Sequence, residues 1–319
     1  MDVARASEAY RGELLAHCYR MLGSLHDAED LVQETMLRAW RFAGGYDESR
    51  GSIRTWLYRI ATNACLSYLD GRQRRVLPVD VNGPSQVPDI EKVEEHLEIP
   101  WLQPFPDALV PAGDPAAVVE ARESIRLAFI AALQHLPPRQ RAVLILRDVL
   151  AMPASDVALL LELTVASVNS ALQRARAQLA AASPSADDAG LVQPSDTETR
   201  DLLDRYTAAF TAMDVEALKE TLREDALLQM PPFPEWFLGR DAIGDFLASG
   251  FARGGAYRFV ASRANGQPAV LLYRRRDSDV YRFLHVQVVT MSAAGITRID
   301  GFHAAELYRP FGLPDVLAD

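Results

Sequence analysis

Residues 136–179, LPPRQRAVLILRDVLAMPASDVALLLELTVASVNSALQRARAQL, decide the fold of the central part of the chain. Pro137 separates two apolar helical patterns, Pro153 begins a short third one, and Thr164 is a typical N-cap residue for the next. Four helices are expected, at about 116–135, 138–149, 154–161 and 165–181. They form an all-α domain over 116–182, in which the last two helices make a helix-turn-helix.

The last helix of this domain has two distinct faces. Its inward face carries Val168, Leu172, Ala175 and Leu179. Its outward face carries Ser167, Asn169, Ser170, Gln173, Arg174 and Arg176. A recognition helix reads base edges with its N-terminal residues and contacts phosphates further along, which suits small polar residues followed by arginines. The pattern favours DNA binding, with an ordinary helical hairpin as the alternative.

Residues 5–75 form a second all-α domain, and its helix at 27–42 has a polar outer face. The inward residues are Leu31, Val32, Thr35, Met36, Ala39 and Trp40. The outward residues are Asp30, Gln33, Glu34, Leu37, Arg38 and Arg41, preceded by Asp27 and Glu29 near the N-terminus, where the helix dipole favours acids. This face is either a solvated surface or a docking site.

The next helix, Ser52 to Asp70, combines arginines with aromatic rings. Its apolar stripe is Ile53, Leu57, Ile60, Ala64 and Tyr68, and Arg54, Arg59, Thr62 and Asn63 face another side. Trp56 and Tyr58 lie among them, and Arg72, Arg74 and Arg75 follow. Such a set could neutralise phosphates and stack on unpaired bases. A core tryptophan beside a solvated basic end is the alternative.

The charge of the chain is divided unevenly among its segments. The 319 residues are 49% hydrophobic and carry a net charge of −10. Residues 1–75 sum to +1 and 116–183 to +2, whereas 76–115 sum to −7 and 184–319 to −6. The two helical domains are therefore slightly basic. The acidic, proline-rich stretch 76–115 is a predicted linker.

No apolar run is long enough for a membrane span, so a cytoplasmic protein without a membrane partner is expected. Cys18 and Cys65 lie in apolar helical patterns and are expected to be reduced core residues.

After a second linker at 183–195, residues 196–319 change to an α+β pattern. Helices are expected at 196–222 and near 240–250. Strands are expected at 226–230, 257–264, 269–275, 280–291 and 296–302. Within the first linker, residues 99–105 are aromatic enough to dock on a neighbouring domain.

Three segments in order, at 10–40, 52–75 and 136–179, resemble the extracytoplasmic-function (ECF) group of sigma-70 factors, including YRGELLAHCYRMLGSLHDAEDLVQETMLRAW. The resemblance implies two all-α domains, sigma region 2 and sigma region 4. It implies that region 2 binds core RNA polymerase, with Asp27, Glu29, Asp30, Gln33, Glu34, Leu37 and Arg38 on the coiled coil of the largest subunit. It assigns recognition and melting of the minus-10 element to the loop 43–51 and to Arg54, Trp56, Tyr58, Arg59, Asn63, Arg72, Arg74 and Arg75. It assigns contacts with minus-35 DNA to Ser167, Asn169, Ser170, Gln173, Arg174 and Arg176.

Residues 196–319 resemble the SnoaL-like branch of the NTF2-like fold, a curved sheet around a pocket. WLQPFPDAL (101–109) and NGQPAVLLYRR (265–275) resemble the SigG-type subgroup of ECF factors. Cyclases of this fold use a pocket Asp or His, so Asp241, His285, Asp300 and His303 are candidates, but core packing is the expected role. The residues expected to line a pocket for a small apolar ligand are Trp236, Phe237, Tyr273, His285, Asp300 and His303.

The expected function is promoter-specific transcription initiation, with the C-terminal domain regulating the two DNA-binding domains. No catalytic residue, metal or cofactor is expected. Core RNA polymerase and promoter DNA are the expected partners, and an anti-sigma protein stays an open question. Two alternatives remain, a cyclase or isomerase carrying DNA-binding modules and a helix-turn-helix regulator that acts without polymerase.

Overall fold

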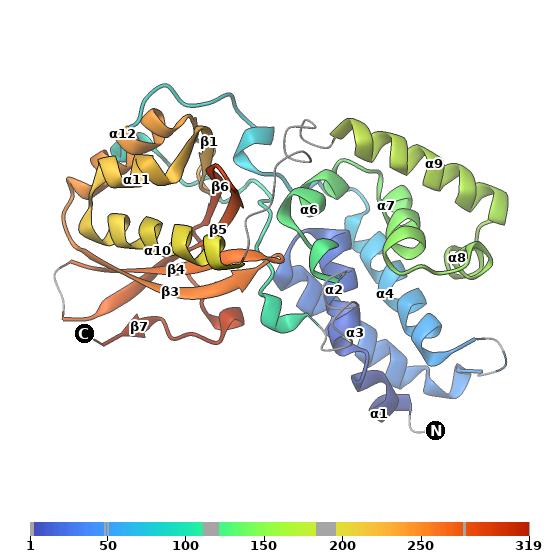
Figure 1. Cartoon of the computed structure of the whole chain (residues 1–319). Coiled ribbons are helices and arrows are strands. Elements are labelled where there is room, and N and C mark those ends of the chain that lie inside the picture. The colour runs from blue at the N-terminus through green and yellow to red at the C-terminus, as the bar shows by residue number, and fades with distance from the viewer. Residues whose placement is uncertain are drawn as a thin grey trace. The chain divides into compact units, whose positions relative to one another are not determined.

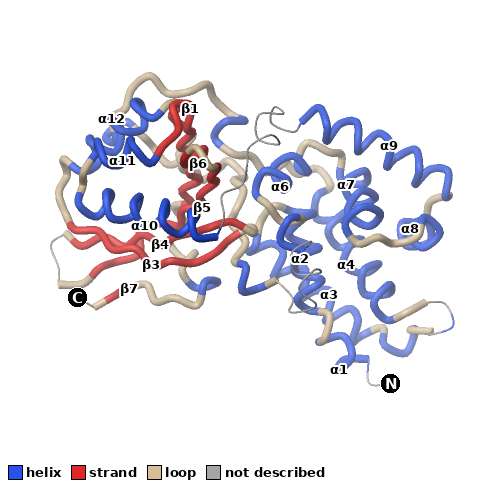
Figure 2. Tube along the Cα trace, viewed as in Figure 1, coloured by secondary structure: helices blue, strands red, loops and turns tan. Residues whose placement is uncertain are grey.

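A computed structural model describes residues 3–47, 49, 51–110, 121–182, 196–276 and 279–318. The chain divides into two compact units, and each unit combines two separate stretches of sequence. The first unit is Met1–Arg75 with Leu109–Pro184, and the second is Val76–Ala108 with Ser185–Asp319. The first unit is helical, and the second is built around a β-sheet (Figures 1 and 2). The multidomain fold expected from the sequence is therefore present.

The first half of the helical unit consists of α1 (Val3–Glu8), α2 (Arg11–Leu22), α3 (Leu25–Arg41), the 3-10 turn η1 (Ala43–Gly45) and α4 (Ile53–Leu69). Gly23 ends α2 with a φ of 68°, and the Ser24 hydroxyl begins α3 by accepting the Asp27 N–H at 3.2 Å. Ser52 caps α4 in the same way. The buried core between these helices includes Leu14, Cys18, Met21, Ala28, Val32, Leu57, Ala61 and Cys65.

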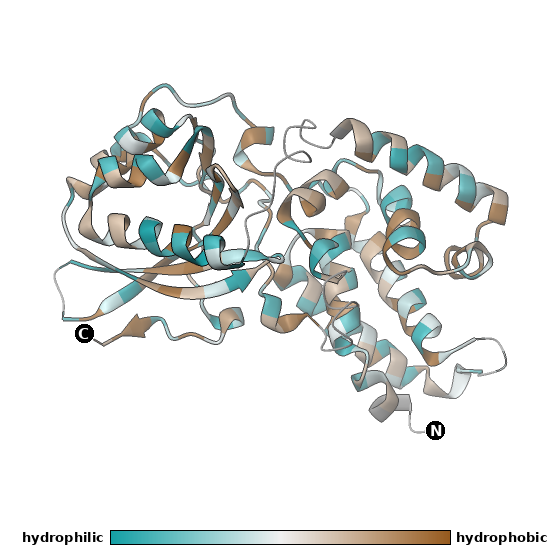
Figure 3. Cartoon of the chain, in the orientation of Figure 1, coloured by the Kyte–Doolittle hydropathy of each residue, from teal (hydrophilic) through white to brown (hydrophobic). Residues whose placement is uncertain are grey.

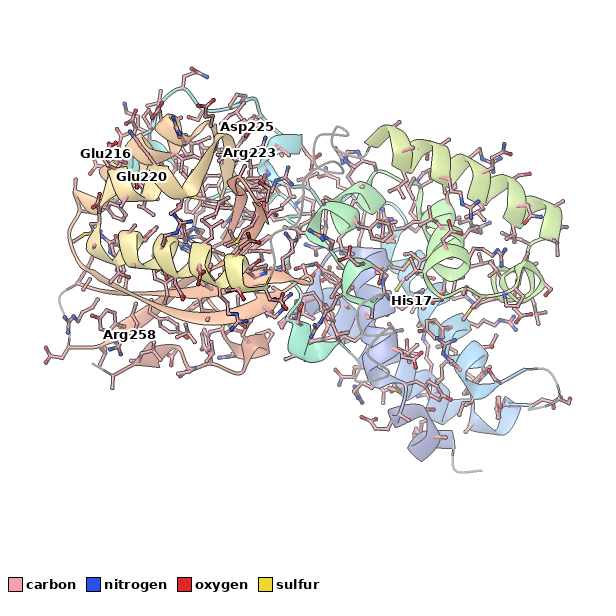
Figure 4. All side chains as sticks on the ribbon, in the orientation of Figure 1. His17, Glu216, Glu220, Arg223, Asp225 and Arg258 are labelled. Atoms are coloured by element: carbon pink, nitrogen blue, oxygen red, sulfur yellow. The ribbon has the colours of Figure 1, made fainter. Side chains whose placement is uncertain are left out.

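His17 is a neutral residue of this core (Figure 4). Its Nε2 is hydrogen-bonded to the Thr62 hydroxyl at 2.9 Å, and its ring lies 5.0 Å from that of Tyr58. Burial lowers the pKa of His17 to about 3. Thr62 is fully buried rather than turned outward as expected, because its hydroxyl is needed to satisfy this imidazole.

The second half of the helical unit contains α6 (Leu127–Gln134), α7 (Pro138–Leu144) with the π-helical turn η6 (Ile145–Val149), α8 (Ala154–Leu161) and α9 (Val165–Ala182). Thr164 caps α9 by accepting the Ser167 N–H at 3.1 Å, as expected. Within the described residues, no single helix is long and apolar enough to cross a membrane, and α8 and α9 pass that test only as a pair bent by 99°.

The prediction of a single helix at about 116–135 is wrong for its described part, residues 121–135. The chain is helical up to Glu123, turns at Ser124, and becomes helical again from Leu127. The turn allows Ser124 to accept hydrogen bonds from Arg20 through both its carbonyl and its hydroxyl oxygens. Residues 116–120 and the linker expected at 183–195 lie outside the described residues.

The second unit has three helices and seven strands among its described residues. They are α10 (Asp196–Ala212), α11 (Val215–Thr221), β1 (Leu222–Gln229), β2 (Trp236–Leu238), α12 (Arg240–Phe251), β3 (Ala256–Ala264), β4 (Gln267–Arg275), β5 (Tyr281–Ser292), β6 (Gly295–Phe302) and β7 (Val316–Leu317). The strand order is β2-β1-β6-β5-β4-β3, with β7 beside β5, and only β1 and β6 pair in parallel.

All five expected strands are present, whereas the short strands β2 and β7 were not expected. The helix expected at 196–222 is broken at Met213, which has a φ of 56°, and Asp214 caps a new helix by accepting the Ala217 N–H at 3.0 Å. An Asp at this place is a strong N-cap, so the break is favoured locally.

The three helices cover one face of the sheet. Their buried side chains, such as Tyr206, Phe210 and Phe246, pack against sheet residues that include Leu272 and Ile299. Because side chains alternate along a strand, the neighbours of these sheet residues point to the opposite face.

Residues 76–108 of the predicted linker 76–115 belong to the second unit and are not a free tether. Their helical elements are the 3-10 turns η3 (Pro78–Asp80), η4 (Ile90–Lys92) and η5 (Asp107–Leu109), and Val76, Trp101 and Pro106 take part in isolated β-bridges. Trp101, Leu102 and Phe105 are buried. Asn265 fixes Phe105 from both sides, since the Asn265 N–H donates to the Phe105 carbonyl and the Phe105 N–H donates to Asn265 Oδ1, each at 2.8 Å.

Asp107 completes this attachment by accepting the Gly266 N–H at 2.8 Å and lying 3.3 Å from Arg263. The segments 101–109 and 265–275, which carried the subgroup resemblance, are thus in direct contact.

Candidate polymerase and DNA interfaces

The outer face of α3 carries the residues expected to bind polymerase. Asp30 and Gln33 are exposed, Leu37 is 51% exposed, and Glu34 pairs with Arg38 on the helix surface. Trp40 was expected to point inward, and this prediction is wrong, since the side chain is 66% exposed. At about 100° per residue, Trp40 lies opposite Leu31 around the helix axis. With the exposed Phe42, it extends the face as an aromatic end.

Two residues expected in different interfaces are bound to each other. Asp27 and Arg75 form an ion pair in which both side chains are largely buried. Arg72, beside this pair, places its guanidinium 3.8 Å from the centre of the Tyr68 ring. This arrangement fixes the chain after α4 against the start of α3, so Asp27 and Arg75 have a structural role here.

The loop before α4 and the first turns of α4 enclose a hollow of about 120 Å³. Tyr46 and Trp56 line it with ring centres 5.4 Å apart, and Arg59 borders it. Ser52 and Thr55 supply hydroxyl groups to the same hollow. The site therefore combines flat rings, hydroxyls and a cation, which is the chemistry that binds an unstacked base. Sequence reasoning did not single out Tyr46, although an aromatic residue after Gly44-Gly45 was a usable signal.

One of the expected minus-10 residues, Tyr58, points inward, and a second, Arg54, is partly exposed but bound to Glu13. Tyr58 is 1% exposed, and burial raises its pKa. Its hydroxyl donates to Glu13 at 3.3 Å, and Arg54 donates to the same carboxylate at 2.7 Å. The expectation that Tyr58 contacts DNA does not fit this buried position. The prediction failed because the spacing of aromatic residues along a helix does not tell whether they face the core or the surface. Asn63, Arg72 and Arg74 are exposed as expected.

The helix-turn-helix places all six expected minus-35 residues outward. Ser167, Asn169, Ser170, Gln173, Arg174 and Arg176 are exposed, while Val168, Leu172 and Ala175 are buried. Hydrophilic and hydrophobic residues alternate along α9 (Figure 3). Arg176 is bound to Asp148 by two hydrogen bonds of 2.8 and 2.7 Å, so this arginine is not available for DNA until that exposed pair separates.

The two halves of the helical unit are joined by polar contacts. Arg141 of α7 is 2% exposed and donates to the Met21 carbonyl of α2 as well as to Gln134 and Leu136. Arg20, also buried, donates to the Ser124 hydroxyl at 2.7 Å. Burial lowers the pKa of each guanidinium to about 10. These anchors were not expected, since arginines are usually exposed.

The second half of the helical unit covers the candidate base site in the first half. Arg59 donates to Glu162 of the α8–α9 turn at 2.8 Å, and Leu159 and Leu160 of α8 close one side of the hollow. Glu162 has a φ of 57°, a backbone conformation that favours glycine.

The six residues expected to form a C-terminal pocket do not converge. His285 and His303 stack at 4.0 Å on the helix-covered face, where Phe237 packs on Phe246. Asp300 lies on the opposite face, where it accepts a hydrogen bond from Gln229 at 2.5 Å. Trp236 donates to the Asn82 carbonyl of the linker, and Tyr273 donates to the Pro314 carbonyl.

The histidine pair is a neutral polar cluster of the domain interior. His285 is hydrogen-bonded to Gln287 at 2.9 Å, and Gln287 accepts the Tyr206 hydroxyl at 3.0 Å. Burial lowers the pKa of His303 to about 4 and places that of His285 well below its usual value. Asp241, the remaining candidate for proton transfer, is exposed and 3.5 Å from Lys219. These residues do not assemble an acid–base pair.

Comparison with known proteins identifies all three parts of the chain. The Sigma-70 region 2 profile matches residues 7–75, the Sigma-70 region 4 profile matches 126–179, and the SnoaL-like domain profile matches 203–299. The ECF RNA polymerase sigma factor SigG of Mycobacterium tuberculosis is 48% identical over 318 residues, which cover 99% of this chain and 85% of that protein. This chain belongs to the ECF sigma factors.

Two more distant relatives match nearly the whole chain. The probable ECF RNA polymerase sigma factor SigI of M. tuberculosis is 26% identical over 300 residues, 93% of this sigma factor and 91% of SigI. The crystal structure of M. tuberculosis SigJ superimposes with a TM-score of 0.60 at 20% identity, covering 98% and 99% of the two chains. The expected family is confirmed, and with it the expectation of an initiation factor rather than an enzyme.

Proposed function

We propose that this sigma factor binds core RNA polymerase and directs it to promoters, and that its C-terminal domain regulates this activity. The observation that carries the proposal is the distribution of side chains on α9, whose six expected base and phosphate contacts are all exposed over a buried apolar face. A recognition helix requires this separation. Since polymerase is cytoplasmic, we place the protein there.

The outer face of α3 is the proposed polymerase contact, with Asp30, Gln33 and Leu37 at its centre. Full-length protein carrying Asp30→Ala and Gln33→Ala should retain core polymerase at least tenfold less well in a pull-down. The matched control is Glu8→Ala with Ser67→Ala, two exposed positions away from this face. If the wild-type chain does not retain polymerase, the sigma-factor function is wrong.

The hollow at Tyr46 and Trp56 is the proposed site for a flipped base of the minus-10 element. A base held there would offset the few kcal/mol lost on unstacking, so melting needs no ATP. Trp56→Ala should prevent open-complex formation, detected by permanganate reactivity of unpaired thymines, while leaving polymerase binding unchanged. Tyr58→Phe is the control, because that ring faces the core.

The described arrangement of the helical unit is the proposed closed state. Arg59 is occupied by Glu162, and α8 borders the base site, so promoter melting requires α8 to move away. The C-terminal domain can influence this step through residues 76–108, which connect the two sigma domains and pack on its sheet.

Regulation through the linker can be tested without removing a domain. Deleting 196–319 would uncover Trp101, Leu102 and Phe105, so that deletion alone is ambiguous. Asn265→Ala removes the side-chain acceptor for the Phe105 N–H and should loosen the linker, while Asn82→Ala changes a more exposed contact. Altered promoter-specific run-off transcription by Asn265→Ala supports regulation. Unchanged transcription by both this variant and the deletion contradicts it.

The two other candidate functions are not favoured. An enzyme would need converging catalytic groups, but Asp300 and the histidine pair lie on opposite faces of the sheet. Aromatic and aliphatic side chains pack together in the domain interior, which does not favour a small apolar ligand there. A polymerase-independent regulator would have no use for the face of α3.

A further inference from the structure

A hollow of about 790 Å³ lies where the linker meets the C-terminal domain. One wall is formed by Asp89 and Glu91 of the linker turn η4. The other wall is formed by the chain after α12 and the end of β4, with Arg253, Gly255 and Arg276. Both walls belong to the same compact unit. None of its lining residues belongs to the polymerase, minus-10 or minus-35 surfaces.

The guanidinium groups of Arg253 and Arg276 line this hollow, and that of Arg274 lies near both of them. Arg253 and Arg276 are exposed, and neither forms an ion pair within the part of the chain that the structure describes. Arg274 does not line the hollow; it donates to the Gly254 carbonyl at 2.5 Å and lies 5.3 Å from the centre of the Tyr257 ring, and its buried Nε has no hydrogen-bond partner among the described residues. Burial and repulsion from Arg276 and Arg253 lower the pKa of Arg274.

A fourth arginine lies on the neighbouring strand. Arg282 of β5 is directly opposite Arg274 of β4 in the antiparallel register. Like charges in such a pair are destabilising, and the surrounding domain is otherwise acidic. A cluster of this kind is relieved most directly by a bound anion, and guanidinium groups match phosphate oxygens with paired donors.

The backbone at the hollow is shaped for close approach. Gly255 has a φ of 113°, and a Cβ there would lie 2.7 Å from the Arg275 carbonyl. Only glycine fits this position, so the turn between Arg253 and β3 passes directly beside the arginine-bearing strand.

Arg253 has a simpler explanation by itself, because it follows the C-terminus of α12 and complements the negative end of the helix dipole. The partial negative charge of the helix end does not account for Arg274 and Arg276, which come from a strand.

The carboxylates of the opposite wall limit the size of the ligand. Asp89 is balanced by Lys92 at 3.5 Å, but Glu91 is exposed and would repel a long polyanion. A compact anion can remain on the arginine wall.

We propose that this hollow binds a small phosphate-bearing molecule through Arg253 and Arg276, with the charge of Arg274 close to both. A bound molecule would reach from the C-terminal domain towards the linker turn and fix Ile90–Lys92 in place. Through the regulatory role proposed above, occupancy would then change how firmly the linker is held. The site makes the C-terminal domain a receptor for a phosphorylated metabolite.

Calorimetric titration of the full-length chain with pyrophosphate tests the site directly, at low ionic strength and without polymerase. Saturable binding is expected, and Arg253→Ala with Arg276→Ala should weaken it at least tenfold, because each removes a charge-assisted contact. The control pair is Arg205→Ala with Arg240→Ala, exposed arginines elsewhere in the same domain. Far-UV circular dichroism and the thermal midpoint verify that all variants fold.

Three results would overturn the proposal. The first is that pyrophosphate does not bind saturably to the wild-type chain. The second is that the Arg253/Arg276 double variant and the control double variant bind pyrophosphate with equal affinity. The third is that pyrophosphate does not bind but a non-promoter DNA duplex does, and that the duplex requires Arg253 and Arg276. Hydrogen exchange of residues 89–92 supplies an independent measurement, with slower exchange expected when pyrophosphate is bound. Because these assays contain no polymerase, their outcome is independent of whether the sigma-factor function holds.

Discussion

Replacing Ser124 with Ala should open the closed state of the helical unit. The Ser124 hydroxyl accepts a hydrogen bond from Arg20 Nη2 at 2.7 Å, and Arg20 is only 4% exposed. The variant leaves that guanidinium with the Ser124 carbonyl at 3.3 Å as its remaining partner across the contact. A hydrogen bond to a charged group contributes about 1.5–3 kcal/mol, and 1.4 kcal/mol is about tenfold in an equilibrium constant. The open fraction should therefore rise by roughly 10- to 150-fold relative to the closed fraction.

The assay is energy transfer between dyes on added cysteines at Ser67 and Gln178, exposed positions of α4 and α9. Native Cys18 and Cys65 should not react, since both are fully buried and burial raises the pKa of the Cys65 thiol. The variant should show a larger low-transfer population and faster association with core polymerase. Ser155→Ala, an exposed hydroxyl in α8, is the control.

An unchanged distribution of transfer efficiencies in the Ser124→Ala protein, together with an unchanged association rate, would refute the reasoning. It would mean that Arg20 and Ser124 do not limit opening.

Three further outcomes are expected. Phe105→Ala should lower the free energy of unfolding of the C-terminal unit by about 3–5 kcal/mol in urea titrations, because the ring is fully buried, whereas Leu97→Ala, 75% exposed in the same linker, should change it by less than about 0.5 kcal/mol. Between pH 6.5 and about 4, the histidine at position 303 is protonated in the unfolded chain but neutral in the folded protein. The free energy of unfolding should therefore fall as the pH decreases through this window, and His303 should account for about 3 kcal/mol of that fall. His303→Gln should flatten that slope, and an unaltered slope would contradict the assignment. Glu162→Gly should release Arg59 and relieve the left-handed backbone, giving equal or higher thermal stability of the helical unit with faster open-complex formation. Slower formation would show that Glu162 does not shield the base site.

The periodicity of apolar residues predicted the five expected strands and most of the helices, but it did not show the breaks at Ser124 and Met213. The N-caps at Thr164 and the proline-marked breaks were local signals, and the structure contains them where expected. The short strands β2 and β7 carried too few residues to show a period. The break at Ser124 depends on Arg20, which is over a hundred residues away in sequence, so local patterns could not contain it.

The candidate sites divide in the same way. Exposure on α9 follows from a simple helical wheel, and all six residues were placed correctly on its outer face. Trp40 and Tyr58 exchanged sides relative to expectation, because an aromatic ring suits both core and surface, and only the neighbouring helices determine which is available. The prediction of a pocket in the C-terminal domain was wrong for a geometric reason, since the alternation of side chains along the chain places Asp300 and His303 on opposite faces of the sheet.

The packing of residues 76–108 against a sheet whose last strand ends at Leu317 has a consequence for synthesis. A ribosome completes both promoter-reading domains before the strands that hold their connecting segment have emerged. The nascent chain therefore passes through a period in which this segment is not yet restrained. Likewise, cleavage between the two last domains would not separate them at once, because the earlier segment would still attach the C-terminal fragment. Control of this sigma factor by its last domain begins only when the whole chain has been made.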